Sequence, residues 1–405
     1  MKKNLNKVYL KRGKEESLLR MHPWVFSGAI HHTDDGIEEG QVVSVYTAQG
    51  EYVATGHFQN SSIAVRVLTF RDEPIDNDFW KRRLLQAWQL RRTVGLTDQP
   101  GTDAFRLVHG EGDLLPGLVV DVYGHTAVVQ SHSAGMHRQR HDIAQALHEA
   151  LPDRIRHIYY KSETTLPYMS QTGEAENGYL LGGCEDDVAM ENGLKFHVDW
   201  LKGQKTGFFV DQRDNRLLLE RYAKGRRVLN MFCYTGGFSF YAMRGGADLV
   251  HSVDSSAKAV ELTRSNVKLN FPDDSRHEAY CDDAFRFLER MGRPDSPDHG
   301  LGYDLVVLDP PAFAKHRGAL HNALKGYTRL NAEALSQMKP GSLLFTFSCS
   351  QVVTKDHFRA ALFTAAAQAG RDVSVLHQLH QPADHPINIY HPEGEYLKGL
   401  VLYVR

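Results

Sequence analysis

Residues 228–239 read VLNMFCYTGGFS and decide the fold of the second half of the chain. An apolar, strand-like run ends in a turn that carries Gly236 and Gly237, and the pattern of a helix follows. Glycines at such a turn let the backbone approach a ligand closely and begin a helix. Glycine after a strand is common, so the turn alone is weak evidence for a ligand-binding site. The residues that follow it are needed to support that interpretation.

Three further apolar runs with few charges, LVHSVD, YDLVVLD and SLLFTFS, alternate with helical segments after the turn. Such runs are typical of a parallel sheet that helices cover on both faces. The sequence from 191 to 405 therefore predicts a doubly wound, Rossmann-like α/β domain. Its last two strands, VSVLHQLHQ and LKGLVLYVR, predict an antiparallel hairpin at the sheet edge.

Carboxylates follow the second and third strands of this domain. Asp254 ends the second strand, where a carboxylate can accept hydrogen bonds from ribose hydroxyls, and Asp283 follows the third. The turn does not read GxGxxG, so a nucleoside ligand without a pyrophosphate, such as S-adenosylmethionine, fits better than a dinucleotide. The alternative for both residues is a generic α/β turn with a helix-capping Asp.

Two further groups follow the fourth and fifth strands, namely Asp309-Pro310-Pro311 and Cys349. Ligands in open α/β sheets bind beyond the carboxyl ends of the strands, so we expect both groups at the cleft. The prolines stiffen a loop that can hold a planar nucleobase with its edge against the Asp309 carboxylate. A rigid turn with a structural Asp, and a merely buried cysteine, are the alternatives.

A thiol in this position serves one particular methylation chemistry. Carbon 5 of cytosine is a poor nucleophile until a thiolate adds to carbon 6 and makes the ring enamine-like. After methyl transfer, a base removes the carbon-5 proton and the thiol leaves, whereas exocyclic amines need no such thiol. A small buried side chain explains Cys184, Cys233 and Cys281, so Cys349 is the predicted nucleophile.

The first 190 residues predict two smaller units. Residues 1–72 contain short alternating strands between glycine turns and predict a β-barrel. Residues 73–190 begin with a linker whose Asp76 or Asn77 caps a helix that ends at Gly95, and they continue as a mixed α+β unit with a hairpin turn at Gly124. This central unit shows no catalytic constellation and is interpreted as a spacer or a substrate-gripping domain.

Composition limits the class of protein. The chain has 405 residues, 42% hydrophobic and 24% charged, with a net charge of −2. Such a chain is expected to form two or three domains and is neither a disulfide scaffold nor a disordered protein. The cysteines form no CxxC pair, so no metal site is expected. A cytoplasmic location is expected because no signal-peptide core and no bilayer-spanning run is present. Basic clusters near the N-terminus and at 81–92 indicate either RNA-facing surfaces or solvated faces.

Several motifs together resemble the RlmI family, the large-subunit (23S) ribosomal RNA cytosine-C5 methyltransferases. These motifs are NMFCYTGGFS, DDAF, LDPPAF and FSCS, together with HPWVFSGAI, GFFVDQRDNR and ADHPINIYHPEGEYLKG, so the likeness covers nearly the whole chain. The resemblance implies an N-terminal PUA RNA-binding barrel, a central α+β domain and a C-terminal Rossmann-like methyltransferase domain that uses S-adenosylmethionine. These correspond to residues 1–72, 73–190 and 191–405.

The resemblance also implies roles for single residues. The methyl donor would be bound by Gln212, Phe232, Tyr234, Gly236, Gly237, Asp254, Asp283 and Asp309. Within this set, Asp254 would hold the ribose and Asp283 the adenine amino group. Asp309 would face the target base and Cys349 would be the nucleophile, so these two are the expected catalytic residues. The substrate would be contacted by Pro310, Pro311 and Lys315.

The sequence departs from the family pattern in two places. Ala312 stands where family members often carry Lys, so Lys315 is one substitute for a contact to RNA phosphate, and the alternative is that no residue makes it. No second cysteine accompanies the D-P-P loop, so the base that removes the carbon-5 proton is not identified. Candidates for it are His385, Glu395 and Lys398, each of which can instead have a structural role.

Three functions remain open at this stage. The favoured one is an S-adenosylmethionine-dependent methyltransferase for a cytosine carbon 5 of 23S rRNA. The second is an RNA methyltransferase acting on a guanine or adenine nitrogen, which would leave Cys349 idle and would usually stack an aromatic side chain where Ala312 stands. The third is a non-catalytic, PUA-type RNA-binding assembly factor. The expected partner is 23S rRNA, no membrane is expected, and a homodimer is left open.

Overall fold

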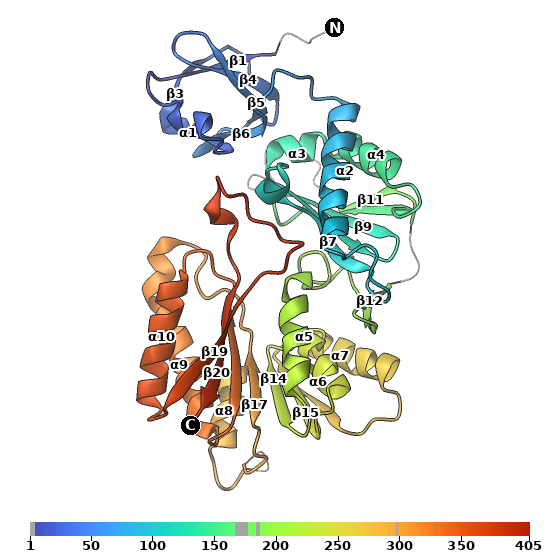
Figure 1. Ribbon diagram of the computed structural model, residues 1–405, viewed down its shortest axis with the longest axis vertical. Helices are drawn as coiled ribbons and strands as arrows, with labels where there is room; N and C mark the ends of the chain where they lie inside the picture. Colours follow the sequence, from blue (N-terminus) through green and yellow to red (C-terminus); the bar gives the residue numbers. More distant parts are fainter. Residues whose placement is uncertain (1–4, 167–176, 184–186, 297–298) are drawn as a thin grey trace. The chain divides into compact units, whose positions relative to one another are not determined.

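The computed structural model describes residues 5–166, 177–183, 187–296 and 299–405 (Figure 1). The chain divides into two compact units. The first comprises Met1–Gly193, Val198–Val210 and Ala383–Gly394, and the second comprises Leu194–His197, Asp211–Pro382 and Glu395–Arg405. Among the described residues, no helix combines the length and the apolar content that a bilayer crossing needs. The expected domain boundaries at residues 72 and 190 stay predictions.

The first unit begins with a six-stranded sheet in the order β2-β6-β5-β4-β1-β3. The elements are β1 (Lys7–Leu10), α1 (Glu16–Leu19), β2 (Trp24–Phe26), η1 (Ser27–Ala29), β3 (Ile30–Thr33), β4 (Val42–Tyr46), β5 (Tyr52–Phe58) and β6 (Ile63–Thr69). Alternate side chains such as Val43 and Val45 are buried inside it. β5 and β6 approach so closely that a Cβ at Gly56 would lie 2.3 Å from the Arg66 carbonyl oxygen, which explains a glycine within a strand. The predicted small β-barrel is confirmed.

A five-stranded sheet in the order β11-β10-β9-β8-β7 follows in the same unit. This part of the unit comprises α2 (Asn77–Thr93), β7 (Ala104–His109), η2 (Gly110–Asp113), β8 (Leu118–Tyr123), β9 (Thr126–Ser131), α3 (Ala134–Arg138), α4 (Arg140–Ala150), β10 (His157–Tyr160), β11 (Gly178–Leu181) and β12 (Val188–Glu191), of which β12 lies outside the five-stranded sheet. The Asp76 carboxylate caps α2 by accepting from the Phe79 N–H at 3.0 Å, as expected. α2 ends at Thr93, two residues before the expected Gly95. The hairpin turn at Gly124 joins β8 and β9 as expected.

The second unit contains a seven-stranded sheet in the order β16-β15-β14-β17-β18-β20-β19. Its strands are β13 (Leu194–His197), β14 (Arg227–Met231), β15 (Leu249–Asp254), β16 (His277–Cys281), β17 (Leu305–Leu308), β18 (Leu343–Ser348), β19 (Val373–His380) and β20 (Lys398–Val404), of which β13 lies outside this sheet. The strands from β16 to β18 are parallel, and β20 is antiparallel to both of its neighbours. The predicted doubly wound domain and the antiparallel pair at its edge are confirmed.

Helices cover both faces of this sheet (Figure 1). They are η3 (Val210–Gln212), α5 (Arg213–Tyr222), α6 (Gly237–Arg244), α7 (Ala257–Asn270), α8 (Ala284–Met291), η4 (Arg317–Ala319), α9 (Leu320–Gln337) and α10 (Lys355–Gln368), with Val210 of η3 belonging to the first unit. A further short helix, η5 (Pro392–Gly394), belongs wholly to the first unit. Strand residues Leu229, Val306 and Leu344 pack with Phe287, Tyr327 and Leu362 of the helices in one buried core. The core therefore fixes where each parallel strand ends.

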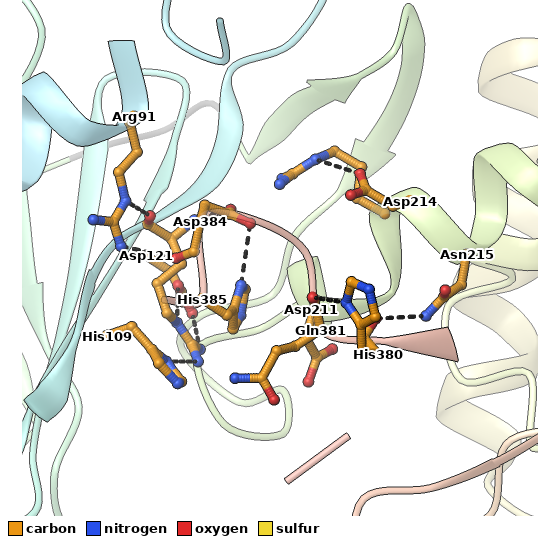
Figure 2. Close-up of polar contacts among 12 residues, drawn as sticks. Arg91, His109, Asp121, Asp211, Asp214, Asn215, His380, Gln381, Asp384 and His385 are labelled. Atoms are coloured by element: carbon orange, nitrogen blue, oxygen red, sulfur yellow. Dashed lines mark hydrogen bonds and ion pairs between the residues drawn. The ribbon is translucent and has the colours of Figure 1, made fainter. Parts of the chain in front are cut away.

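The connection between β19 and β20 is not a tight hairpin loop, because Ala383–Gly394 belong to the first unit. There the Arg91 guanidinium donates to the Asp384 carbonyl oxygen at 2.8 Å, and the Asp384 carboxylate accepts from the Arg106 N–H at 2.9 Å (Figure 2). Arg91 also pairs with the buried carboxylate of Asp113. Removing one member of such a network would leave a buried charge without compensation. The sequence pattern of the two strands gave no indication of this anchor.

Candidate active site

The turn after β14 has an unusual backbone. Phe232 and Tyr234 have φ angles of 58° and 47°, in the left-handed region that L side chains avoid, and Gly236 has 86°. Each such side-chain residue costs about 1–2 kcal/mol, so the surrounding contacts must hold the turn in place. The Tyr234 N–H donates to the Asp254 carboxylate at 3.0 Å, and the Thr263 hydroxyl donates to the Tyr234 carbonyl at 2.9 Å. Strain held in this way is characteristic of ligand-binding turns.

Gly236 is required at this turn for steric reasons. A Cβ there would lie 2.6 Å from the Phe240 ring and 2.7 Å from the Thr263 methyl group. Gly236 is also the N-cap of α6, which begins at Gly237. The structure thus brings the predicted residues Phe232, Tyr234, Gly236 and Gly237 together in one turn, with the two aromatic side chains half-buried.

Asp254 is fixed by two backbone groups. One carboxylate oxygen accepts from Tyr234 as described, and the other accepts from the Ser256 N–H at 2.9 Å. The side chain is half-buried. A carboxylate oxygen has two lone pairs, so each oxygen retains an acceptor site for a hydroxyl of a bound nucleoside. The arrangement fits the expected contact to the ribose of S-adenosylmethionine.

Asp283 has the structural role that the sequence analysis gave as its alternative. Its carboxylate caps α8 by accepting from the Arg286 N–H at 3.1 Å, and the side chain is exposed. The neighbouring Asp282 carboxylate pairs with Arg290. A capping carboxylate keeps one oxygen available to a ligand amine, so the expected contact of Asp283 to adenine stays a prediction.

Asp309 and Gln212 meet although they are far apart in sequence. The Gln212 side-chain amide donates to the Asp309 carboxylate at 3.0 Å, and its oxygen accepts from Asn215 at 2.7 Å. Gln212 is buried and Asp309 is half-buried, so the amide fixes the direction of the carboxylate. Pro310 is buried, whereas Pro311 and Lys315 are exposed after it. Sequence reasoning missed Asn215, for which the i, i+3 spacing to Gln212 was the available signal.

Cys349 is half-buried directly after β18, between two serines whose hydroxyl groups are both hydrogen-bonded. The Ser348 hydroxyl donates to the Tyr327 hydroxyl at 2.9 Å, and the Ser350 hydroxyl donates to the Ala314 carbonyl at 2.5 Å. Burial, with smaller contributions from the negative charges of Cys349 and Asp309, raises the pKa of Tyr327 to about 12. Both groups therefore lie within electrostatic reach of the Tyr327 hydroxyl. Sequence reasoning missed Tyr327, because its position fits the ordinary pattern of an aromatic residue in a helix core.

The other cysteines differ from one another. Burial raises the pKa of Cys233 to about 12, so its thiol stays protonated, as a structural role requires. Cys281 was expected to be buried, and this was wrong: it ends the edge strand β16 and is exposed. Cys184 lies outside the described residues.

Two of the three candidate bases belong to the same unit as Cys349. Lys398 is buried on β20, whereas Glu395 is partly exposed and pairs with Lys355 at 2.5 Å. His385 belongs to the first unit, where its Nδ1 lies 3.1 Å from the Asp384 carboxylate (Figure 2). Among the described residues, no group of three or more His, Cys, Asp or Glu side chains is arranged to hold a metal ion.

These residues share one edge of the second unit's sheet. The Tyr234 turn, Asp254, Asp283, Asp309 and Cys349 follow β14, β15, β16, β17 and β18, which are neighbours in the sheet and parallel. Carboxyl ends of parallel strands are the usual ligand-binding edge of such a fold. The turn, Asp254 and Asp283, which are expected to bind the donor, lie toward β16, and Asp309 and Cys349, which are expected to face the base, lie toward β18.

Comparison with known proteins agrees with this arrangement. Residues 174–391 match the family of S-adenosylmethionine-dependent methyltransferases, and residues 8–70 match the PUA-like domain. Ribosomal RNA large subunit methyltransferase I of Klebsiella pneumoniae (strain 342) is 40% identical over 402 residues, which is 98% of each chain. The protein of the same name from Tolumonas auensis is 42% identical, again over 98% of both chains.

Solved structures support the fold. A chain from Streptococcus mutans, described as a candidate S-adenosylmethionine-dependent methyltransferase, has a TM-score of 0.82 at 22% identity and covers 98% of this chain and 100% of its own. A crystal structure of a methyltransferase complexed with SAH has a TM-score of 0.83 at the same identity and coverage. The chain thus belongs to the S-adenosylmethionine-dependent methyltransferases and, among them, to the family of ribosomal RNA large subunit methyltransferase I.

Proposed function

We propose that this protein transfers a methyl group from S-adenosylmethionine to carbon 5 of a cytosine in 23S ribosomal RNA. The observation that carries the proposal is the placement of Asp309 and Cys349 after neighbouring strands, both within electrostatic reach of Tyr327, beside the donor-binding turn. The names of the curated relatives support large-subunit ribosomal RNA as the substrate.

The proposed chemistry uses Cys349 as a nucleophile. Its thiolate forms a bond to carbon 6 of the cytosine, and the ring electrons move to carbon 5. The donor supplies an electrophilic methyl group; carbon 5 attacks it, the bond between the methyl carbon and the donor sulfur breaks, and the donor leaves as a neutral thioether. A base then removes the carbon-5 proton, the sulfur–carbon bond breaks, and the ring and thiolate are restored. The Asp309 carboxylate, directed by Gln212, orients the base edge.

The residues proposed to contact the RNA come from both the N-terminal and the C-terminal half of the chain. The PUA-like barrel and the basic N-terminal residues would bind the RNA backbone, and Pro310, Pro311 and Lys315 would contact the target nucleotide. Such phosphate binding weakens steeply with salt. A cytoplasmic location, which ribosomal RNA as a substrate would require, is part of the same proposal, and assembly as a homodimer is left to measurement.

A stalled intermediate tests the proposal. An RNA fragment of the large subunit that carries 5-fluorocytosine cannot lose a proton from carbon 5, so the sulfur–carbon bond should persist after methyl transfer. We expect a band that resists denaturant, forms only with S-adenosylmethionine, and is absent in Cys349→Ala. Cys233→Ala is the matched control and should keep the band.

The alternatives predict other results. A methyltransferase for a ring nitrogen or an exocyclic amine would form no covalent band and would tolerate Cys349→Ala. A non-catalytic RNA-binding factor would bind no S-adenosylmethionine in a calorimetric titration. Full methylation by Cys349→Ala would overturn the mechanism.

A further inference from the structure

A buried lysine lies directly across the sheet from the Cys349 loop. In the antiparallel pair of β18 and β20, Lys398 is the register partner of Ser348, the residue before Cys349. Its ammonium donates to the Ser350 carbonyl at 2.6 Å and to the Val353 carbonyl at 2.7 Å. Lys398 therefore spans the segment 348–353 and holds it from one side.

The charge of this side chain is costly to bury. Lys398 is 5% exposed, and its burial lowers its pKa to about 8. The negative charge of Cys349 acts in the opposite direction and raises this pKa, so the ammonium and the sulfur interact. A loop that needed only a structural clasp would be served at lower cost by a neutral donor.

The other charged groups around the sulfur do not replace this cation. The negative charges of Asp309 and Cys349 both act on the neutral Tyr327 hydroxyl of α9, so Asp309 adds an anion to this neighbourhood. Beyond Lys398 lie Glu395 and Lys355, which pair with each other at 2.5 Å, and Lys355 is more than half exposed. An anionic sulfur that shares its neighbourhood with a carboxylate is disfavoured unless a cation stands near it.

We propose that Lys398 is a positioning residue for Cys349, which clasps the 348–353 loop and holds a positive charge beside the sulfur so that the thiolate is the favoured form. The role rests on the proposed function in taking Cys349 as the nucleophile. It differs from that of the base that removes the carbon-5 proton, because Lys398 acts on the nucleophile rather than on the ring.

The test is the pH dependence of Cys349 alkylation in the full-length protein without RNA. Iodoacetamide reacts with the thiolate, and mass spectrometry of the tryptic peptide 330–355, which contains a single cysteine, follows Cys349 alone. Lys398→Gln keeps amide donors for the carbonyls but removes the charge. We expect its alkylation midpoint to rise by about one pH unit, which makes alkylation about tenfold slower at pH values below both midpoints.

Matched variants separate the effect of the Lys398 charge from the effect of its hydrogen bonds to the loop. Lys398→Arg keeps the charge and should keep the wild-type midpoint, whereas Lys398→Met should shift it upward at least as far as Lys398→Gln. Lys355→Met removes the nearby exposed charge and should shift the midpoint by less than a third as much. Melting temperature and S-adenosylmethionine affinity, measured in each variant, verify that the unit is folded.

A wild-type midpoint in both Lys398→Gln and Lys398→Met would overturn the role. If Lys398→Gln alone fails to fold, the comparison of Lys398→Arg with Lys398→Met decides in the same way. The proposed function fails separately: ribosomal RNA methylation that survives Cys349→Ala would remove the nucleophile, whereas the shift of the midpoint would remain.

Discussion

The donor side and the base side of the methyltransferase sheet are built by different means. On the expected donor side, the candidate contacts come from the backbone of one turn and from two carboxylates held by nearby backbone N–H groups, as when Asp254 accepts from Tyr234 and Ser256. On the base side, side chains from distant segments meet, as when Gln212 binds Asp309 and Lys398 clasps the Cys349 loop. The donor side is therefore a local structure, and the base side depends on the folded unit as a whole.

This difference has consequences for mutation. A local turn depends on backbone conformation, so its weak points are the positions where only glycine or a fixed carboxylate fits. A site of converging side chains depends on directed polar contacts, so its weak points are the partners that hold a reactive group. The variants described below each change one of the two sides, so that the effects on methylation and on donor binding can be compared.

The largest effect is expected at Asp309. In Asp309→Ala, methyl transfer should fall by about 10²–10⁴-fold, because the group that orients the base edge is lost. Donor affinity should fall much less, as measured by calorimetry. Gln212→Leu keeps the carboxylate and removes only its directing hydrogen bond, so about a tenfold loss is expected. Equal losses of methylation and of donor binding in Asp309→Ala would place Asp309 wholly on the donor side.

Gly236→Ala should be the most damaging change on the donor side. The added Cβ combines a left-handed backbone with close contacts to Phe240 and Thr263, so we expect about 2–4 kcal/mol of lost unfolding free energy, with weaker donor binding. Gly225→Ala is the control, because Gly225 also has a positive φ, of 71°, but a Cβ there meets nothing within 4 Å. It should lose only about 1–2 kcal/mol, and denaturant unfolding measures both. Equal losses would mean that steric contact does not constrain the turn.

Asp254→Ala should weaken S-adenosylmethionine binding by about 1.5–3 kcal/mol, or roughly ten- to a hundredfold, because hydrogen bonds to a charged group are lost. RNA binding, measured by filter retention, should be kept. Asp248→Ala, at the exposed position just before the same strand, is the control and should leave donor affinity unchanged. Unchanged affinity in Asp254→Ala would remove this carboxylate from the donor site.

The stability of the fold is expected to depend on pH through His277, the first residue of the outermost strand β16. Burial lowers the pKa of His277 to about 4, and its ring bonds to the Ser252 hydroxyl at 2.8 Å. The unfolded chain binds a proton near pH 6.5 and the folded chain near pH 4, so stability is lost as pH falls between these values. From pH 7 to pH 5 we expect a loss of about 2 kcal/mol from this group, absent in His277→Asn. The exposed His299 provides the control variant, His299→Asn, which should retain the loss.

Much of the fold followed from local patterns. Apolar runs with few charges predicted the strands of the parallel sheet, and the glycine turn and the residues after each strand predicted which positions share its binding edge. Two features were not foreseen, for a common reason. Cys281 was expected to be buried, but β16 is the edge strand and exposes it. The antiparallel pair of the last two strands was confirmed, but nothing in the sequence indicated that the long connection between them belongs to the first unit. Neither strand order nor the destination of a long loop is encoded in local periodicity.

The sequence by itself determined the class of fold, the donor-binding turn and the candidate nucleophile, because these depend on residue types at short spacing and on the rule that ligands bind at strand ends. Only the tertiary structure decided that Gln212 directs Asp309, that Tyr327 lies beside both reactive groups, and that Lys398 clasps the Cys349 loop. The bond of Lys398 to Ser350 joins residues 48 positions apart, and the bond of Gln212 to Asp309 joins residues 97 positions apart. They depend on the packing of helices and strands around one core, which no short stretch of sequence specifies.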